Sequence, residues 1–215
     1  MNAARDEILA RVRAALADVP ESERPADVPV ARQYVTGADA PAGVQETVSL
    51  FVERLADYGA SVRTVSPAQA GTEVAKTLAS WGAEQVLVPR GFPASWSAHL
   101  PAAAVLGDEG RLSADDLDAV DAVVTTAAAA IAVTGTLVLD GGPGQGRRAA
   151  TLVPDRHLCV LRADQVVASV PEALSRLDPL RPLTFVSGPS ATSDIELERV
   201  AGVHGPRTLE VLVVR

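Results

Sequence analysis

Helical and extended patterns alternate from residue 44 to residue 88, and this alternation constrains the fold more than any other feature of the sequence. Apolar residues with a 3.6-residue period run from Val44 to Leu55, and Gly59 is placed to end that helix in a left-handed conformation. Ser61 to Val65 is a short run typical of a strand, and Val86 to Val88 is another, with a second helical pattern between them. Such alternation is typical of crossover units, so the sequence predicts an α/β fold, mainly a parallel sheet flanked by helices.

The longest uncharged run covers 18 residues, from Ala122 to Leu139, which is close to the length that spans a bilayer. It contains four threonines and a glycine, and Asp121 and Asp140 flank it with no Lys or Arg beside them. We therefore expect no membrane span and interpret the run as strand, turn, strand. Other predicted elements of the second half are strands at residues 158–161, 183–187 and 209–214 and a short helix at residues 171–177.

Composition limits the possible partners and the compartment. The formal net charge is −8 and the pI about 4.9, so a polyanion would be repelled and no nucleic-acid partner is expected. Only 3% of residues are aromatic, so the core must be built from Val, Leu and Ala. Cys159 is the single cysteine, too few for a disulfide or an iron–sulfur cluster. We expect a reduced, cytoplasmic protein, no metal site, and an inert Cys159 within an apolar strand.

The N-terminal segment is predicted to stand apart from the rest. Residues 8 to 19 carry apolar side chains on one helical face, and Pro20, Pro25 and Pro29 then interrupt any regular element. The expected organisation is a helical arm and Pro-rich linker at residues 1–30 and an α/β domain at residues 31–215. The arm either covers the same domain or contacts a neighbouring subunit.

Two loops of the central region carry residues that packing does not obviously require. The first is Thr134-Gly135-Thr136, where a glycine permits close approach and two hydroxyls are available, although a locally bonded turn is the alternative. The second is the Gly-rich segment from Asp140 to Arg148. Its amides and paired guanidiniums could bind an anion, with Gly144, Gly146, Arg147 and Arg148 as ligand-binding candidates. It is not a P-loop, because Arg147-Arg148 replaces Lys-Ser/Thr, and residues 149–153 are predicted to be extended.

Two C-terminal loops complete the candidate site. Ser187 to Asp194 follows a predicted strand and precedes a predicted helix near Ile195, at the kind of sheet edge where ligands bind in α/β proteins. Its ligand-binding candidates are Ser187, Gly188, Ser190 and Asp194. His204, between Val203 and Gly205-Pro206, is the candidate acid or base. For His157, at a strand start, a structural hydrogen bond is the expectation.

These loops together resemble a known family. The segment from Thr134 to His157 is similar to the central signature of the LUD-domain family, formerly a domain of unknown function. The segments Ser187 to Glu196 and Gly202 to Pro206 resemble its C-terminal signature. The resemblance covers the chain from about Ala122 onward.

The resemblance implies a fold of the NagB/RpiA/CoA-transferase-like superfamily, which includes sugar-phosphate isomerases and CoA transferases. It also implies an accessory role in bacterial L-lactate utilization, in which iron–sulfur partner proteins oxidise lactate to pyruvate and this chain itself binds no cofactor. A small organic anion is the expected ligand. The family does not define whether the chain is catalytic.

One departure from the family pattern bears on catalysis. Members often carry an acidic residue just before the Thr-Gly-Thr, whereas this sequence has Val133, so no carboxylate nucleophile is available there. Asp194 and Glu196 are the nearest substitutes in the motifs. Two alternatives therefore stay open beside the accessory subunit: a stand-alone isomerase or acyl/CoA-transferase-like enzyme, and a non-catalytic assembly scaffold.

Overall fold

A computed structural model describes residues 3–20, 22–27, 29–31, 43–107, 112–192, 200–201 and 204–215. The chain divides into two compact units, residues 1–34 and residues 35–215. The first contains helix α1 (Ala3–Ala15) and the 3-10 turn η1 (Pro25–Asp27). No residue of α1 is buried, and the apolar side chains of Ile8 and Val12 are exposed.

The second unit is built on a six-stranded parallel sheet in the order β1-β12-β7-β4-β2-β3. Its strands are β1 (Ser61–Val65), β2 (Val86–Leu87), β3 (Val105–Leu106), β4 (Ala122–Thr125), β7 (Arg156–Arg162) and β12 (Thr208–Val214). The two longest strands, β7 and β12, lie side by side in the middle. Their nearly continuous apolar sequences suit burial on both faces. The predicted mainly parallel sheet is confirmed.

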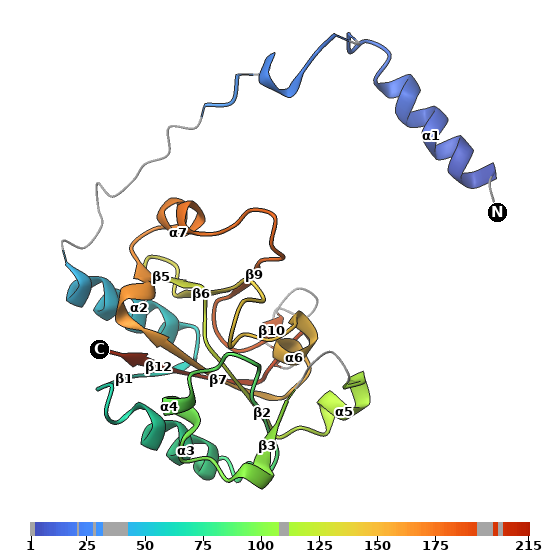
Figure 1. Ribbon diagram of the computed structural model, residues 1–215. Helices are drawn as coiled ribbons and strands as arrows, with labels where there is room; N and C mark the ends of the chain where they lie inside the picture. The colour runs from blue at the N-terminus through green and yellow to red at the C-terminus, as the bar shows by residue number, and fades with distance from the viewer. Residues whose placement is uncertain are drawn as a thin grey trace. The chain divides into compact units, whose positions relative to one another are not determined.

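Helices cover both faces of this sheet (Figure 1). Helices α3 (Ala70–Ser80) and α4 (Ala94–Ser97) pack on one face through Val74, Leu78 and Trp96. Helix α2 (Val44–Asp57) packs on the other face through Phe51 and Leu55. Gly59 follows α2 with a φ of 87° and donates its amide to the helix end, as predicted.

A second, four-stranded sheet lies on the α2 side. Its order is β8-β5-β6-β9, with β5 (Ala129–Ile131), β6 (Thr136–Leu139), β8 (Val166–Val167) and β9 (Thr184–Val186). Its pairings are antiparallel apart from β5 with β8. One face contributes Leu137 and Leu139 to the core beneath α2, and the other packs against α7 (Val170–Arg176).

The uncharged run of residues 122–139 therefore forms three strands, β4, β5 and β6, instead of the two predicted. The missed strand, β5, is Ala-Ala-Ile, and alanine has little preference for strands. The hydrogen-bonded pairing of β5 with β6 and β8 stabilises this strand in spite of its low intrinsic preference. No helix within the described ranges is long and apolar enough to cross a membrane.

Short elements connect the strands within and between the two sheets. They are the 3-10 turns η2 (Ala102–Ala104) and η3 (Ala163–Gln165), helices α5 (Ala114–Asp118) and α6 (Arg148–Leu152), and the paired strands β10 (Ala191–Thr192) and β11 (Val200–Ala201). Helix α6 corrects the prediction that residues 149–153 are extended. Its Ala150 is fully buried against Leu87 and Val123, so tertiary packing decides the local conformation. The helix predicted near Ile195 lies outside the described residues.

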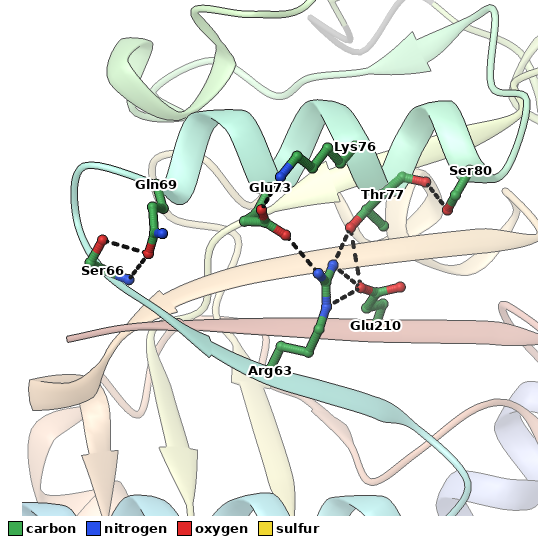
Figure 2. Close-up of polar contacts among 8 residues, drawn as sticks. All are labelled: Arg63, Ser66, Gln69, Glu73, Lys76, Thr77, Ser80 and Glu210. Atoms are coloured by element: carbon green, nitrogen blue, oxygen red, sulfur yellow. Dashed lines mark hydrogen bonds and ion pairs between the residues drawn. The ribbon is translucent and has the colours of Figure 1, made fainter.

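An ion-pair cluster joins α3 to the neighbouring strands β1 and β12 of the parallel sheet (Figure 2). The guanidinium of Arg63 on β1 contacts Glu210 on β12 at 2.5 Å and Glu73 on α3 at 2.7 Å. It also donates to the hydroxyl of Thr77, which in turn donates to Glu210 over 3.1 Å. Lys76 pairs with the same Glu73 carboxylate. All of these side chains bind one another within the cluster. The role of the cluster is therefore to fix α3 on β1 and β12.

Candidate functional site

The second unit contains a cavity with a volume of about 970 Å³. It lies between α6, the segment that follows β9, and the loops that precede β7 and β12. Its polar and charged lining residues are Asp118, Arg148, Thr151, Asp155, His157, Thr184, Ser187, Ser190, His204 and Arg207, and Leu152, Val153, Phe185, Val186 and Leu209 add apolar surface. The cavity is large enough for a small organic molecule.

This cavity opens at the amino ends of β7 and β12, where Asp155 precedes one strand and Arg207 precedes the other. The sequence had suggested that Ser187 to Asp194 follows a strand at the usual ligand-binding edge of the sheet. That prediction is wrong for the parallel sheet, because β9 pairs with β6 in the second sheet. The site is therefore formed where the two sheets meet. Asp194 itself lies outside the described residues.

A smaller cavity of about 430 Å³ adjoins the first. It is lined by the end of β6, the Gly-rich loop and the segment before β9: Leu139, Asp140, Gly141, Gln145, Gly146, Arg147, Arg148, Thr151, Arg181, Pro182 and Thr184. Arg148, Thr151 and Thr184 line both cavities. Arg148 therefore lies at the boundary between them.

The other arginines of the two cavities are already engaged. Arg207 makes a two-pronged ion pair with Asp155 at 2.6 and 2.9 Å, and these hydrogen bonds hold the pKa of the Asp155 carboxyl below its ordinary value. Arg181 pairs with Asp140 at 2.6 Å, and Arg147 donates to the carbonyl of Leu112.

Arg148 differs from them. Its side chain is exposed, and within the described part of the chain no hydrogen bond or ion pair engages its guanidinium. This cation is thus available to an anionic ligand.

Two of the predicted loops meet at the larger cavity. The hydroxyl of Ser190 accepts a hydrogen bond from the amide of His204 at 2.9 Å, and the amide of Ser190 donates to the carbonyl of Pro206 at 2.8 Å. The structure thus gathers Ser187, Gly188, Ser190 and His204 around the same cavity as Arg148. The side chain of His204 is exposed at this site.

Thr134-Gly135-Thr136 lies outside the lining of both cavities. The Thr136 hydroxyl is 2.7 Å from the hydroxyl of Thr134 and 2.7 Å from that of Ser187, so the turn is connected to the cavity through Ser187. Gly135 has a φ of 56°, and a side chain there would come within 2.7 Å of the Leu55 backbone nitrogen.

Gly188 has the same kind of surroundings as Gly135. Its φ is 100°, and a Cβ atom there would lie 2.6 Å from the Cβ of Tyr58, just after α2. Close packing on α2 explains both glycines.

The Gly-rich loop is largely bonded to its own neighbours. The amide of Gly144 donates to the Arg90 carbonyl at 2.8 Å, and its carbonyl accepts from Thr126. The amide of Gly142 donates to the carboxylate of Asp140. These amides are not available to an anion, and of the predicted glycines in this loop Gly146 is the one that lines a cavity.

Several residues that line the cavity were not predicted from the sequence, among them Asp155, Arg207 and His157. For His157 a hydrogen bond was expected and is present, but its position at a cavity was not foreseen. His157 belongs to β7, is 1% exposed, and its Nε2 lies 2.7 Å from the hydroxyl oxygen of Thr125 on β4. Burial lowers the pKa of His157 to about 4, so the imidazole is neutral near pH 7. A pattern of apolar strand residues does not show that one position borders a cavity. Cys159, two residues on, is buried as predicted, and burial raises the pKa of its thiol to about 12.

Among the described residues, no group of three or more His, Cys, Asp or Glu side chains is placed to hold a metal ion.

The fold and the cavity define an α/β protein with a polar site between a parallel and a mixed sheet. The family model for the LUD domain matches residues 95–214, and the chain belongs to the LUD-domain family, as the motifs had indicated. Lactate utilization protein C of Deinococcus radiodurans is 44% identical to it over 216 residues, which cover 98% of this chain and 95% of that protein. Lactate utilization protein C of Bacillus pumilus is 37% identical over 84 residues, 35% of each chain.

A solved structure shows the same fold. The crystal structure of a DUF162 family protein from Deinococcus radiodurans is 41% identical, with a TM-score of 0.68. The match covers 81% of this chain and all of that one.

Proposed function

We propose that this chain is an accessory protein of L-lactate utilization that binds a small organic anion in the larger cavity. The family membership and the names of its relatives, lactate utilization protein C, support the process. The position of Arg148 supports the ligand class.

Arg148 is the observation on which the ligand class depends. The chain carries a net charge of −8, so an anion gains nothing from the average field and needs a local cation. Arg148 supplies one at the boundary of the two cavities, and its planar guanidinium matches a carboxylate or phosphate. Asp118 also lines the larger cavity, which favours a ligand of low charge over a polyanion.

The hydroxyl-bearing loops would orient the bound anion. Ser187 and Ser190 line the same cavity as Arg148, and Ser190 is fixed by its bonds to His204 and Pro206. In this proposal Thr136 positions Ser187 without touching the ligand. His204 would exchange a proton with the ligand or with solvent.

Oxidation of lactate would belong to iron–sulfur partner proteins. A cluster requires several thiolate ligands, and these 215 residues contain one cysteine, Cys159, which is buried in β7. The proposed division of labour leaves anion binding to this chain and electron transfer to the partners.

The direct test measures binding of L-lactate and pyruvate by calorimetry to the wild type, to Arg148→Gln and to Arg162→Gln. Loss of a charged hydrogen-bond partner costs about 1.5–3 kcal/mol, so Arg148→Gln should bind roughly 10- to 100-fold more weakly. Arg162 is an exposed arginine paired with Asp164 and lines neither cavity, so Arg162→Gln should bind as the wild type does. The ligand proposal is wrong if the wild type binds neither anion saturably.

Complementation tests the process. In a strain that lacks the gene and depends on L-lactate as carbon source, the wild type and Arg162→Gln should restore growth, and Arg148→Gln should not. Equal growth with Arg148→Gln, together with loss of growth on deletion of residues 1–30, would favour an assembly scaffold. Turnover by the isolated chain would favour the enzyme alternative.

A further inference from the structure

The buried imidazole of His157 has one nitrogen that the fold does not use. Its Nε2 is bonded to Thr125, and among the described residues no hydrogen bond or ion pair engages Nδ1. Among the described residues, every side-chain nitrogen or oxygen that is fully buried has a hydrogen-bond partner. Nδ1 is therefore not enclosed, and the space it can reach is the larger cavity, whose lining includes His157.

We propose that His157 contacts the ligand at the floor of the larger cavity, where its Nδ1 forms a hydrogen bond with an uncharged hydroxyl or carbonyl group of a small carboxylate whose charge Arg148 holds. This inference rests on the proposed function and specifies its ligand class. The ligand is then a hydroxy or oxo acid, and a plain carboxylate would leave Nδ1 without a partner.

The chemistry of the imidazole favours an uncharged group at this position. Burial keeps His157 neutral at physiological pH, so it offers one polar atom without a charge. A carboxylate is better placed on the Arg148 guanidinium, which forms charge-assisted bonds. The floor also carries the apolar Leu209, which pairs with His157 in the register of β12 and β7. A small carbon chain between the two polar ends of the ligand suits such a surface.

Thr125 is the positioning residue for this contact. Its hydroxyl fixes one edge of the ring, across the neighbouring strands β4 and β7, and so fixes the direction of Nδ1. If Thr125 donates to Nε2, then Nδ1 carries the proton and donates to the ligand. With the opposite tautomer Nδ1 accepts from a ligand hydroxyl.

Two substitutions separate the two nitrogens. The amide end of glutamine can occupy the place of Nε2, so His157→Gln keeps the contact with Thr125 and removes the polar atom toward the cavity. The shorter asparagine places its amide near Nδ1, so His157→Asn keeps the atom toward the cavity. Binding of L-lactate, pyruvate and, as the ligand without a second polar group, propionate is measured by calorimetry for both variants and the wild type.

The wild type should bind L-lactate or pyruvate more tightly than propionate. His157→Gln should weaken their binding about 3- to 10-fold, the value of one neutral hydrogen bond, and leave propionate unchanged, while His157→Asn should stay closer to the wild type. Nitrogen-15 spectra of the wild type give a second readout that needs no variant to fold. The Nδ1 resonance of His157 should move saturably with added L-lactate or pyruvate.

The outcomes distinguish this inference from the proposed function. Saturable binding that depends on Arg148 but is equal in wild type and His157→Gln, with an unmoved Nδ1 resonance, overturns the role of His157 alone. Absence of saturable binding of any of these anions to the wild type overturns both.

Discussion

The Nε2 atom of His157 lies 2.7 Å from the hydroxyl oxygen of Thr125, across the neighbouring parallel strands β7 and β4. The imidazole is buried, and burial lowers its pKa from 6.5 to about 4. The unfolded chain therefore binds a proton between these two values and the native protein does not. The free energy of unfolding therefore has its full value above pH 6.5. It decreases as the pH falls toward 4, because protonation of His157 then favours the unfolded chain.

We predict that the free energy of unfolding of the wild type falls by up to about 3 kcal/mol between pH 6.5 and pH 4, at about 1.36 kcal/mol per pH unit. His157→Gln has no titratable group at this site and should show a flatter profile in urea unfolding. His204 is exposed, so His204→Gln should keep the wild-type slope. Equal slopes for the wild type and His157→Gln would contradict the assignment.

Gly135→Ala should destabilise the protein by about 2–4 kcal/mol. The residue has a φ of 56°, which costs alanine about 1–2 kcal/mol, and the new Cβ would lie 2.7 Å from the backbone of Arg54 and Leu55, so α2 must shift. Gly82→Ala is the matched control, because Gly82 has a φ of 65° and open space around it; the expected cost is about 1 kcal/mol. If both variants lose the same stability in urea unfolding, the packing of Gly135 on α2 is not the reason for that glycine.

The main sheet could be predicted because its strands and covering helices obey simple local rules. The predicted strand at residues 61–65 has the same bounds as β1, and the pattern between residues 44 and 55 marks α2. The second sheet could not be predicted in full. Its strand β5 is mostly alanine, and its order depends on pairings with β6 and β8 that lie outside any local window.

The candidate site divides in a similar way. The sequence indicated that Arg148, Ser190 and His204 serve one site, and the structure places them around one cavity; that they bind a ligand stays a prediction. The sequence did not show that Gly135 is required for packing on α2. A glycine that contacts a ligand and a glycine that contacts a helix look alike in sequence. Nor did the sequence show that His157 borders the cavity.

We predict that Arg63 on β1 and Glu210 on β12 are energetically coupled. Arg63 contacts Glu210 with two guanidinium nitrogens, and the Glu210 side chain is only 12% exposed. A double-mutant cycle of Arg63→Ala and Glu210→Ala should give a coupling of about 1–2 kcal/mol in urea unfolding. The exposed pair Arg176 and Glu172 on α7 should give less than about 0.5 kcal/mol in the same cycle. Similar couplings for both pairs would show that the cluster contributes no more than a surface ion pair.

Cys159 should be chemically silent in the native protein. It is fully buried in β7, and burial raises the pKa of its thiol to about 12 from an ordinary value of 9, which lowers the thiolate population near pH 8 roughly a thousandfold. Because Cys159 is the single cysteine, reaction with a thiol reagent such as dithiobis-nitrobenzoate reports on it directly. The native protein should react at least about a thousandfold more slowly than the protein in urea. Ala98→Cys in a Cys159→Ser background places a thiol on the surface and should react at the rate of a free thiol. Fast reaction of the native wild type would mean that β7 opens to solvent far more often than the middle strand of a parallel sheet should.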